Sequence, residues 1–301
     1  MRVVVTGPGG RLGRALMAAL GDAPFTGPAG PLGWGRPDYD LDDPDAAARL
    51  VARDRPDLVI HAAAWTDTEA CAHDPTLCRR RNGEATGELA AACAARGIDL
   101  VIVSTNEVFD GRRGDGHGYA VEDAPNPINP YGAGKLAGER AARDGYRGAP
   151  SGLAIVRTAW LFGPPGNDFP AKILAAADRA LLAGEPLRVV ADETGSPTFA
   201  PDLAEAIVEL AGSGAIGGTH HVVNAGAVTR AGWARELLRQ CRVDVPIEEI
   251  TSATWPRASA APPWAVLEPT PLPDGEQLRP WQSALADYVP TLLRLRPAVT
   301  R

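Results

Sequence analysis

Two patterns of apolar and polar positions alternate along the first half of the chain. Short runs of four residues, rich in Val, Ile and Leu, are typical of strands buried on both faces of a parallel sheet. Longer segments between them carry an apolar residue every three or four positions, which predicts amphipathic helices. The expected strands cover residues 2–5, 58–61, 100–103 and 153–156, with a weakly marked one at 32–34 in a segment rich in Gly and Pro. The expected helices cover residues 12–20, 44–53, 76–96 and 130–143.

The second half of the chain follows the same alternation less regularly. It predicts helices over residues 169–183, 201–211 and 230–241, strands over 187–190 and 221–224, and a last helix from about residue 280. Residues 256–273 are rich in proline and predict a loop that forms a wall. Strand and helix in alternation predict an α/β fold with a doubly wound parallel sheet.

Composition narrows the class of protein and of partner. With 45% apolar and 22% charged residues among 301, the chain is typical of a globular protein. Its net charge of -7 argues against nucleic acid as a partner, because phosphate binding relies on basic patches. We find neither a signal-peptide pattern nor an apolar run near the ~20 residues of a membrane span, so we expect a cytoplasmic protein that does not bind membranes. The four cysteines lack C-x-x-C spacing and are expected to be reduced thiols with packing roles.

A glycine-rich turn follows the first expected strand. Gly7, Gly10 and Gly13 recur at a spacing of three, directly before the first amphipathic helix. Such a turn brings backbone N–H groups and a helix N-terminus against a pyrophosphate. The glycine spacing alone would not distinguish it from a glycine-rich turn that binds nothing. In this setting it predicts a Rossmann-type NAD(P)-binding domain over residues 1–163. Residues 164–301 are then expected to form mainly a smaller substrate-binding lobe, with part of the chain returning to the first sheet.

The residues after the second expected strand bear on the choice of cofactor. An acidic side chain there binds the ribose hydroxyls of NADH, whereas a cation binds the 2′-phosphate of NADPH. Arg36, with Arg11 as a helper, favours NADPH. Asp40 leaves NADH open, and its alternative role is that of a turn residue. The small residues Ala62, Ala63 and Ala64 suit a close approach of the backbone to an adenosine, or simply close packing.

Tyr131 and Lys135 are four residues apart and should lie on one face of the helix expected from residue 130. The chain has two lysines against 28 arginines, so a retained Lys suggests a position that requires a compact ammonium. A free phenol, with a pKa of about 10, donates its proton poorly near neutrality, and an adjacent ammonium favours the phenolate. Ser104 and Thr105, at the end of a strand, offer a hydroxyl to the same carbonyl oxygen. Asn82 is a candidate to brace the lysine through water; the alternative for the Tyr–Lys pair is a solvated helix face.

The predicted cofactor site combines the glycine turn, the residues after the second and third strands, and the catalytic helix. Its members are Gly7, Gly10, Arg11, Leu12, Gly13, Arg36, Asp40, Leu41, Ala62, Ala63, Ala64, Tyr131 and Lys135.

Several segments together resemble the dTDP-4-dehydrorhamnose reductase family. They are Gly7-x-x-Gly10-x-x-Gly13, Ala62-Ala63-Ala64-x-Thr66, Ser104-Thr105-x-x-Val108-Phe109-Asp110-Gly111, Tyr131-x-x-x-Lys135, Arg157-Thr158-Ala159-Trp160, Gly195-Ser196-Pro197-Thr198 and Arg279-Pro280-Trp281. The resemblance implies hydride transfer from NAD(P)H to the C4 ketone of a 4-keto-6-deoxyhexose linked to a nucleotide, with dTDP expected, in a monomer or homodimer. It also implies that Thr105, Tyr131 and Lys135 are catalytic. The substrate-binding residues expected from it are Thr105, Asn106, Tyr131, Trp160 and Asn167.

The chain departs from this family pattern in three places. Where the family reads Ser-Thr-Asp-Tyr-Val-Phe, residues 104–109 contain Asn106 and Glu107, closer by one letter to the Thr-Asp-Glu of sugar-nucleotide 4,6-dehydratases. Asn106 cannot supply the acid that a dehydration needs, although Glu107 is a candidate for its base. The family's run Val-Asp-Lys-Ala-Glu is replaced by a different sequence at residues 68–72. The Arg-Pro pair that the family usually has near its C-terminal substrate wall is replaced by Ala261-Pro262. Some relatives bind a metal through acids at a dimer interface, but these acids do not map onto this chain and no metal is expected.

Two other functions stay open at this point. The regulatory subunit of methionine adenosyltransferase resembles the same family and acts by binding, and intact Thr105, Tyr131 and Lys135 argue against that reading. A sugar-nucleotide epimerase or dehydratase that holds NAD tightly is the other alternative. Purified protein that carries nicotinamide would favour an epimerase, whereas reversible NADPH binding would favour a reductase.

Overall fold

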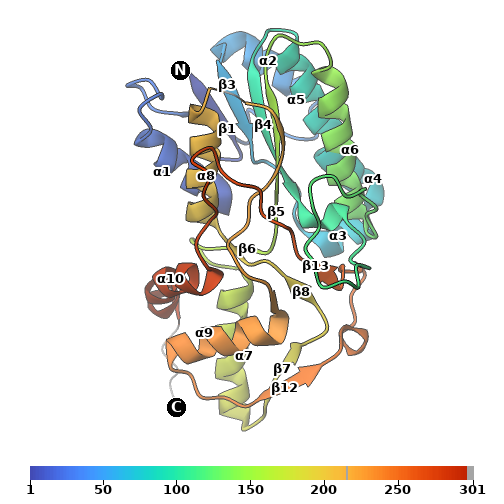
Figure 1. Cartoon of the computed structure of the whole chain (residues 1–301), viewed down its shortest axis with the longest axis vertical. Coiled ribbons are helices and arrows are strands. Elements are labelled where there is room, and N and C mark those ends of the chain that lie inside the picture. The colour runs from blue at the N-terminus through green and yellow to red at the C-terminus, as the bar shows by residue number, and fades with distance from the viewer. Residues whose placement is uncertain (215, 297–301) are drawn as a thin grey trace.

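The computed structural model describes residues 1–214 and 216–296, which form a larger and a smaller lobe (Figure 1). The larger lobe is built on a six-stranded sheet in the order β10-β5-β4-β3-β1-β2, and every pairing in it is parallel. Its strands are β1 (Val3–Thr6), β2 (Leu32–Trp34), β3 (Leu58–His61), β4 (Asp99–Thr105), β5 (Leu153–Thr158) and β10 (Gly218–His221).

Helices cover both faces of this sheet because its strands are apolar on both sides. Val3 and Val5 of β1 pack in one core cluster with α1 (Arg11–Gly21) and α8 (Ala200–Gly212). Val4, which points the other way, packs in a second cluster with α2 (Ala46–Asp54) and α5 (Ala85–Ala94), and α6 (Pro130–Gly145) adds Ala142 to it. The predicted doubly wound α/β fold is confirmed.

The smaller lobe has its own core, in which Phe162, Trp233 and Tyr288 are buried together. Its helices are α7 (Phe169–Ala183), α9 (Arg230–Cys241) and α10 (Trp281–Leu295). Its short strands are β6 (Leu161–Phe162), β7 (Leu187–Val190), β8 (Thr194–Gly195), β9 (Thr198–Phe199), β11 (Val228–Thr229), β12 (Ile247–Ile250) and β13 (Trp264–Ala265).

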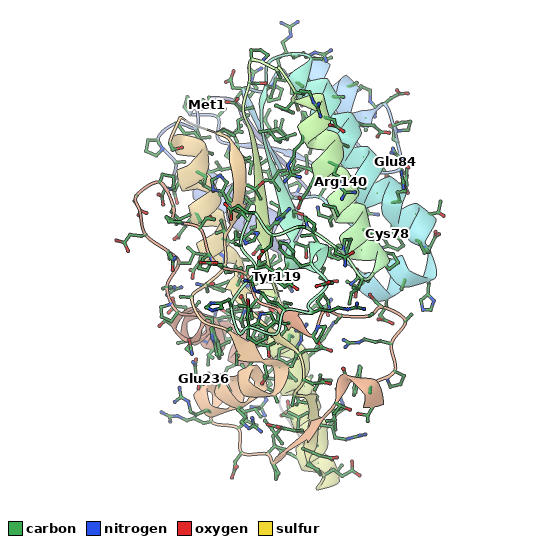
Figure 2. The ribbon with its side chains drawn as sticks, turned by 45° about the vertical axis from the view of Figure 1, so that its right-hand side comes forward. Met1, Cys78, Glu84, Tyr119, Arg140 and Glu236 are labelled. Atoms are coloured by element: carbon green, nitrogen blue, oxygen red, sulfur yellow. The ribbon has the colours of Figure 1, made fainter. Side chains whose placement is uncertain are left out.

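The two lobes share the second half of the chain. Helix α8 packs against α1, and β10 pairs with β5 at the edge of the six-stranded sheet, although both follow residue 163. Figure 2 shows Tyr119 near the middle of the molecule, where the backbone of residue 119 exchanges hydrogen bonds of 2.8 Å with Val266 and Glu268. The division of the chain into lobes at residue 163 stays a prediction.

One expected helix contains a π-helical turn. Residues 75–94 are helical throughout, as α4 (Pro75–Arg79), a π-helical turn (Arg80–Glu84) and α5, after a short α3 (Thr68–His73). Small residues lie between this segment and α6: a Cβ on Gly83 would lie 3.2 Å from the Ala137 side chain, and a Cβ on Gly138 would lie 2.6 Å from the Asn82 carbonyl oxygen. The expected helix is therefore present up to residue 94, and the sequence did not indicate its π-helical turn.

The strand expected over residues 221–224 is wrong in position, since β10 covers Gly218–His221. Residues 222–224 are buried, but they leave the sheet because Asn224 binds another segment: its Oδ1 accepts from the Phe199 N–H at 2.8 Å and its Nδ2 donates to Asp202 at 2.7 Å. Strand β12, with the polar sequence Ile-Glu-Glu-Ile, was missed. Among the described helices, none combines the length and the apolar character needed to cross a membrane.

Candidate active site

The carboxyl ends of the central parallel strands face the smaller lobe (Figure 1). The glycine turn follows β1, residues 62–64 follow β3, and Thr105 ends β4. Ligands of open α/β sheets bind at this edge, at the point where strand order reverses. In this sheet the order reverses between β1 and β3, so the turn after β1 lies at the expected place.

The glycine turn leaves room for a pyrophosphate. Gly7 has a φ of +68°, and a Cβ on Gly13 would lie 2.0 Å from the Gly7 carbonyl oxygen, so both positions require glycine. Helix α1 begins directly after Gly10, which offers no side chain to cap it, and a Cβ on Gly9 would meet nothing within 4 Å. The first-turn N–H groups of α1 are thus uncapped and open to an anion, and the turn fits the diphosphate of a dinucleotide. Leu12 points into the core, so any contact it makes with a cofactor is through its backbone.

The segment after β3 lies against this turn. Ala63 donates its N–H to the Thr6 hydroxyl at 3.0 Å, and a Cβ on Gly7 would lie 3.0 Å from the Ala63 Cα. Asn82 holds the end of the segment by accepting from the Trp65 N–H at 2.8 Å and donating to the Trp65 carbonyl at 2.9 Å. The Asn82 side chain therefore fixes the backbone beside the cofactor site. Its expected role of bracing Lys135 through water stays a prediction.

The residues expected to determine whether NADPH or NADH binds lie in two places, after β2 and beside the smaller lobe. Arg36 is exposed after β2, and Asp40 accepts from the Asp42 N–H at 3.0 Å in the turn role foreseen for it. Leu41 packs against the core of the larger lobe. The Arg11 guanidinium donates instead to the carbonyls of Gly163 at 3.0 Å and Gly166 at 2.7 Å. Arg11 thus binds the entrance of the smaller lobe, and the structure does not give it the helper role beside Arg36.

Helix α6 carries the expected tyrosine and lysine one turn apart. Asn129 begins the helix by accepting from the Gly132 N–H at 2.8 Å, and Pro130 occupies its first position. Lys135 is only 6% exposed, and burial lowers the pKa of its ammonium to about 8. Within residues 1–214 and 216–296, no hydrogen bond or ion pair reaches this ammonium. It is a buried cation in need of a ligand, and the hydroxyls of a ribose would fit it.

Tyr131 is held as a protonated phenol. Burial raises its pKa, the Glu107 carboxylate raises it further, and hydrogen bonding with the Thr105 side chain acts in the opposite direction. Burial and the Glu107 carboxylate thus dominate the pKa of Tyr131, and the lowering expected from Lys135 stays a prediction. The proton is therefore retained at neutral pH.

Thr105 and Ser104 point to opposite faces of β4, as successive residues of a strand do. The Thr105 hydroxyl donates to Asn106 Oδ1 at 3.3 Å and accepts from the Glu107 N–H at 3.2 Å. Ser104 donates to Glu139 at 2.6 Å, and Glu139 forms a buried ion pair with Arg157 at 2.8 Å. Ser104 thus faces α6 and is occupied by Glu139, whereas the Thr105 side chain is the one whose hydrogen bonding lowers the pKa of Tyr131.

Asn106 is buried and joins the strand end to the smaller lobe. Its Nδ2 donates to the Ala265 carbonyl of β13 at 3.4 Å, while its Oδ1 accepts from Thr105. The side chain is thus occupied by protein groups, and its role in substrate binding stays a prediction.

An aromatic wall lies in the smaller lobe. Trp160, with a φ of +42°, stacks on Trp233 at 5.8 Å and carries the Arg230 guanidinium 3.8 Å above its ring. A Cβ on Gly195 would lie 2.4 Å from the Trp160 ring, so this glycine allows the indole to lie flat on the backbone of β8. Asn167 is exposed in the loop before α7, with a φ of +60° and no hydrogen-bond partner in the described chain.

Charged residues that the sequence reasoning missed lie around this wall. Glu193 is 3% exposed and pairs with Arg230 at 3.6 Å and with Arg257. Both guanidinium groups also lower the pKa of Glu107, which burial raises. The only sequence signal for Glu193 was its position next to the family-like segment Gly195-Ser196-Pro197-Thr198, and Arg230 and Arg257 had none.

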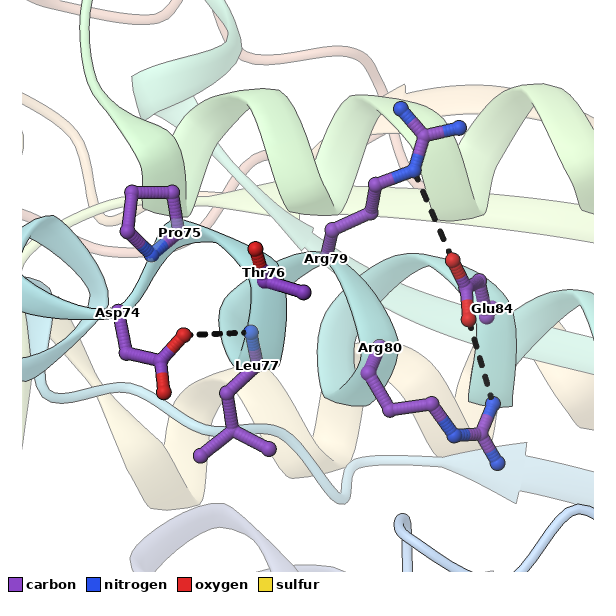
Figure 3. Close-up of a pocket in the computed structure, with 7 residues that line it drawn as sticks. All are labelled: Asp74, Pro75, Thr76, Leu77, Arg79, Arg80 and Glu84. Atoms are coloured by element: carbon purple, nitrogen blue, oxygen red, sulfur yellow. Dashed lines mark hydrogen bonds and ion pairs between the residues drawn. The ribbon is translucent and has the colours of Figure 1, made fainter.

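A surface pocket of about 690 Å³ lies elsewhere, over α4 and the π-helical turn (Figure 3). Glu84 lies between Arg79 at 3.6 Å and Arg80 at 3.9 Å, so its carboxylate is shared by the two arginines. None of the lining residues belongs to the predicted site. They are Asp74, Pro75, Thr76, Leu77, Arg79, Arg80 and Glu84.

Comparison with known proteins gives one consistent family. The family model of the RmlD substrate binding domain matches residues 1–294. The chain is 37% identical over 298 residues to a dTDP-4-dehydrorhamnose reductase of Mycobacterium tuberculosis, which covers 95% of this chain and 91% of the relative. It is 37% identical over 243 residues to a dTDP-4-keto-6-deoxy-D-glucose reductase of Streptomyces niveus, covering 81% of this chain and 80% of the relative.

A solved structure extends this likeness to a bound cofactor. The dTDP-4-dehydrorhamnose reductase of Bacillus anthracis, solved in complex with NADP, superimposes with a TM-score of 0.84 at 28% identity. The match covers 95% of this chain and 98% of that one.

Proposed function

Because this chain belongs to the RmlD substrate binding domain family, we propose that it reduces the C4 ketone of a 4-keto-6-deoxyhexose carried on a nucleotide, with NADPH as reductant. The resemblance to the dTDP-4-dehydrorhamnose reductases noted in the sequence is thereby confirmed. Reductases of two different 4-keto sugars are among the relatives, which supports a dTDP-linked substrate of this class.

The observation that carries the proposal is a buried, unpartnered ammonium beside a protonated phenol at the carboxyl edge of the sheet. When bound, NADPH supplies a hydride to C4. Tyr131, which burial holds in its protonated form, then donates its proton to the carbonyl oxygen. Thr105 holds the same oxygen, and Lys135 binds the cofactor ribose and stabilises the phenolate that remains.

The cofactor proposal rests on the glycine turn and on Arg36. The uncapped first turn of α1 would bind the pyrophosphate, and the exposed Arg36 would bind the 2′-phosphate. The NADP complex of the Bacillus anthracis reductase supports the same choice. Asp40 is occupied by its own turn, which weakens the case for NADH.

The remaining parts of the proposal concern the setting of the enzyme. We propose that Trp160 and Asn167 contact the sugar nucleotide, that the protein acts in the cytoplasm, and that it is a monomer or a homodimer without a bound metal. The intact Thr105, Tyr131 and Lys135 argue against a regulatory subunit that acts by binding alone.

The decisive experiment is identification of a product. Enzymatically prepared dTDP-4-keto-6-deoxy sugars are incubated with NADPH and the purified protein, and the products are identified by NMR. We expect a 4-hydroxy sugar nucleotide together with stoichiometric oxidation of NADPH. Absence of NADPH oxidation with every 4-keto sugar nucleotide offered would favour the regulatory-subunit reading.

A further inference from the structure

Glu107 is a buried carboxylate next to the proposed proton donor, and the reductive mechanism does not use it. Its charge raises the pKa of Tyr131, so the two groups are close enough to interact electrostatically. Burial raises the pKa of Glu107 itself. A carboxylate removed from water in this way is a better base than an exposed one, because its proton affinity is higher.

The position of Glu107 relative to Tyr131 is fixed by a shared residue. Asn129 donates from Nδ2 to Glu107 Oε2 at 2.7 Å, and its Oδ1 begins helix α6, whose second residue is Tyr131. A Cβ on Gly132 would lie 2.0 Å from the Glu107 carbonyl oxygen, so the first turn of α6 packs directly on the Glu107 backbone. Neither group can move far without the other.

The second carboxylate oxygen of Glu107 is unoccupied by protein. Oε1 has no hydrogen-bond partner among residues 1–214 and 216–296. Arg230, Arg257 and Glu193 face Glu107 from the smaller lobe, but no cation comes within the 4 Å of an ion pair with it in the same residues. Both arginines pair with Glu193 instead. One oxygen is thus held by Asn129, and the other is left free to accept a proton.

The chemistry of a bound ketone gives this free oxygen a partner. A carbonyl that accepts a hydrogen bond from Tyr131 and Thr105 withdraws electrons from the carbon atoms on either side, and the C–H bonds on those atoms become acidic. A buried carboxylate that interacts with the same phenol is suited to remove such a proton. We infer that Glu107 takes and returns a proton on a carbon adjacent to the ketone of the bound sugar, so that the site also catalyses enolisation; this rests on the proposed function.

The step is balanced without an oxidant or reductant. The C–H bond breaks, the proton goes to Glu107, and the electron pair forms the carbon–carbon double bond of an enol as Tyr131 gives its proton to the oxygen. The reverse step restores the ketone. Glu107 is largely but not completely buried, so water can reach it and replace its proton between the two steps. A substrate that has passed through the cycle in D2O carries deuterium next to the ketone.

The test separates this exchange from the reduction. The dTDP-4-keto-6-deoxy sugar is incubated in D2O with wild-type protein and NADP+, which fills the cofactor site but cannot reduce the ketone. Deuterium at the carbons beside C4 is followed by NMR and mass spectrometry against a blank without protein. The same preparations are then assayed for ketone reduction with NADPH, and the ratio of exchange rate to reduction rate is compared among variants.

Glu107→Gln is the informative variant because the amide oxygen can still accept from Asn129 but cannot act as a base. Glu122→Gln is its matched control, since Glu122 is exposed and lies outside the site. We expect Glu107→Gln to lower the ratio of exchange to reduction at least about tenfold, and Glu122→Gln to leave it unchanged.

Two results would overturn the inference but not the proposed function. In the first, wild-type protein reduces the ketone but shows no deuterium exchange above the blank. In the second, Glu107→Gln lowers the exchange rate and the reduction rate by the same factor, as loss of a purely structural role would. Wild-type protein that neither exchanges nor reduces would overturn the proposed function and the inference together.

Discussion

The charge of the buried Lys135 ammonium is set by its surroundings. A buried ammonium without a partner is unfavourable, and here burial lowers its pKa to about 8. Its nearest titratable neighbours include Glu139, which favours the charged form, and His61, whose pKa is lowered to about 3 by burial and then by Lys135. His61 is therefore neutral, and the lysine is the only positive charge of the pair.

The role of Tyr131 as proton donor can be tested by removing one oxygen. Tyr131→Phe should lower turnover by at least about 100-fold, because the ketone oxygen then has no acid in reach. Binding of NADPH, followed by fluorescence titration, should change little. Near-normal NADPH oxidation by this variant would contradict the proposed mechanism.

The depressed pKa of Lys135 predicts a pH dependence of cofactor use. Because the pKa is lowered to about 8, the ammonium is present below pH 8 and is lost as the pH rises above it. If NADPH binds the ammonium, kcat/KM for NADPH should be constant near neutrality and fall about tenfold per pH unit above pH 8. The measurement is steady-state kinetics at limiting NADPH between pH 6 and about pH 10.

Lysine-to-arginine variants separate charge from shape. Lys135→Arg should remove the decline above pH 8, because arginine stays charged, yet it should lower kcat, because the fork-shaped guanidinium does not fit the same buried space. Lys172 is exposed on α7, and Lys172→Arg should match the wild type at every pH. A wild-type profile in Lys135→Arg would assign the pH dependence to another group.

At the scale of elements, the bounds of a helix were predicted well from the sequence where capping residues mark its two ends. Helix α9 has its expected bounds because Thr229 accepts from the Gly232 N–H at its start. Helix α7 likewise runs from the cap at Asp168 to Gly184, which is left-handed. These signals lie within a few residues of the element that they define.

Prediction failed where distant segments decide the structure. The π-helical turn at Arg80–Glu84 lies where Gly83 packs against α6, about fifty residues away in sequence. The charged residues around Trp160 come from the loop before β8, from α9 and from the loop after β12, and no local pattern links them. Thr105, Tyr131 and Lys135 could be proposed from the sequence because Thr105 ends a strand and the other two lie one turn apart in the first half of α6.

The turn before α1 makes a prediction that depends on backbone space alone. Gly13→Ala should weaken NADPH binding at least about tenfold, because its Cβ would lie 2.0 Å from the Gly7 carbonyl and distort the turn that binds the pyrophosphate. Gly21→Ala, at the other end of α1, is the matched control, since a Cβ there meets nothing within 4 Å. Isothermal titration with NADPH provides the comparison, and equal affinities for the two variants would count against the turn as the diphosphate site.

At the scale of the whole molecule, the three departures from the family pattern form one connected structure. Glu69 accepts from the N–H groups of Ala258 at 2.7 Å and Ser259 at 3.0 Å. Asn129 donates to the Ala260 carbonyl at 2.8 Å and to Glu107. The altered segment at 68–72, the altered wall near residue 261 and Glu107 are therefore tied together around the same cleft.

The distribution of the core across both halves of the chain predicts the fate of a truncated protein. A fragment of residues 1–163 lacks α8 and β10, so it would expose Leu16 and Leu20 of α1, which pack in the same cluster as Leu203 and Ile207. We expect this fragment to be insoluble or to lack a cooperative thermal transition. Full-length protein is the reference in circular dichroism, and a cooperatively folded fragment would show that the lobe needs neither element.

The path of the chain, which leaves the larger lobe after β5 and returns to it for α8 and β10, also limits how such an enzyme can diversify. Because neither lobe is a continuous stretch of sequence, a gene encoding it cannot acquire a new substrate by exchanging one module for another at a single junction. New specificity is then expected to arise through point changes near Tyr131. Residues 68–72, 106–107 and 261–262, where this chain departs from the family pattern, are tied together there.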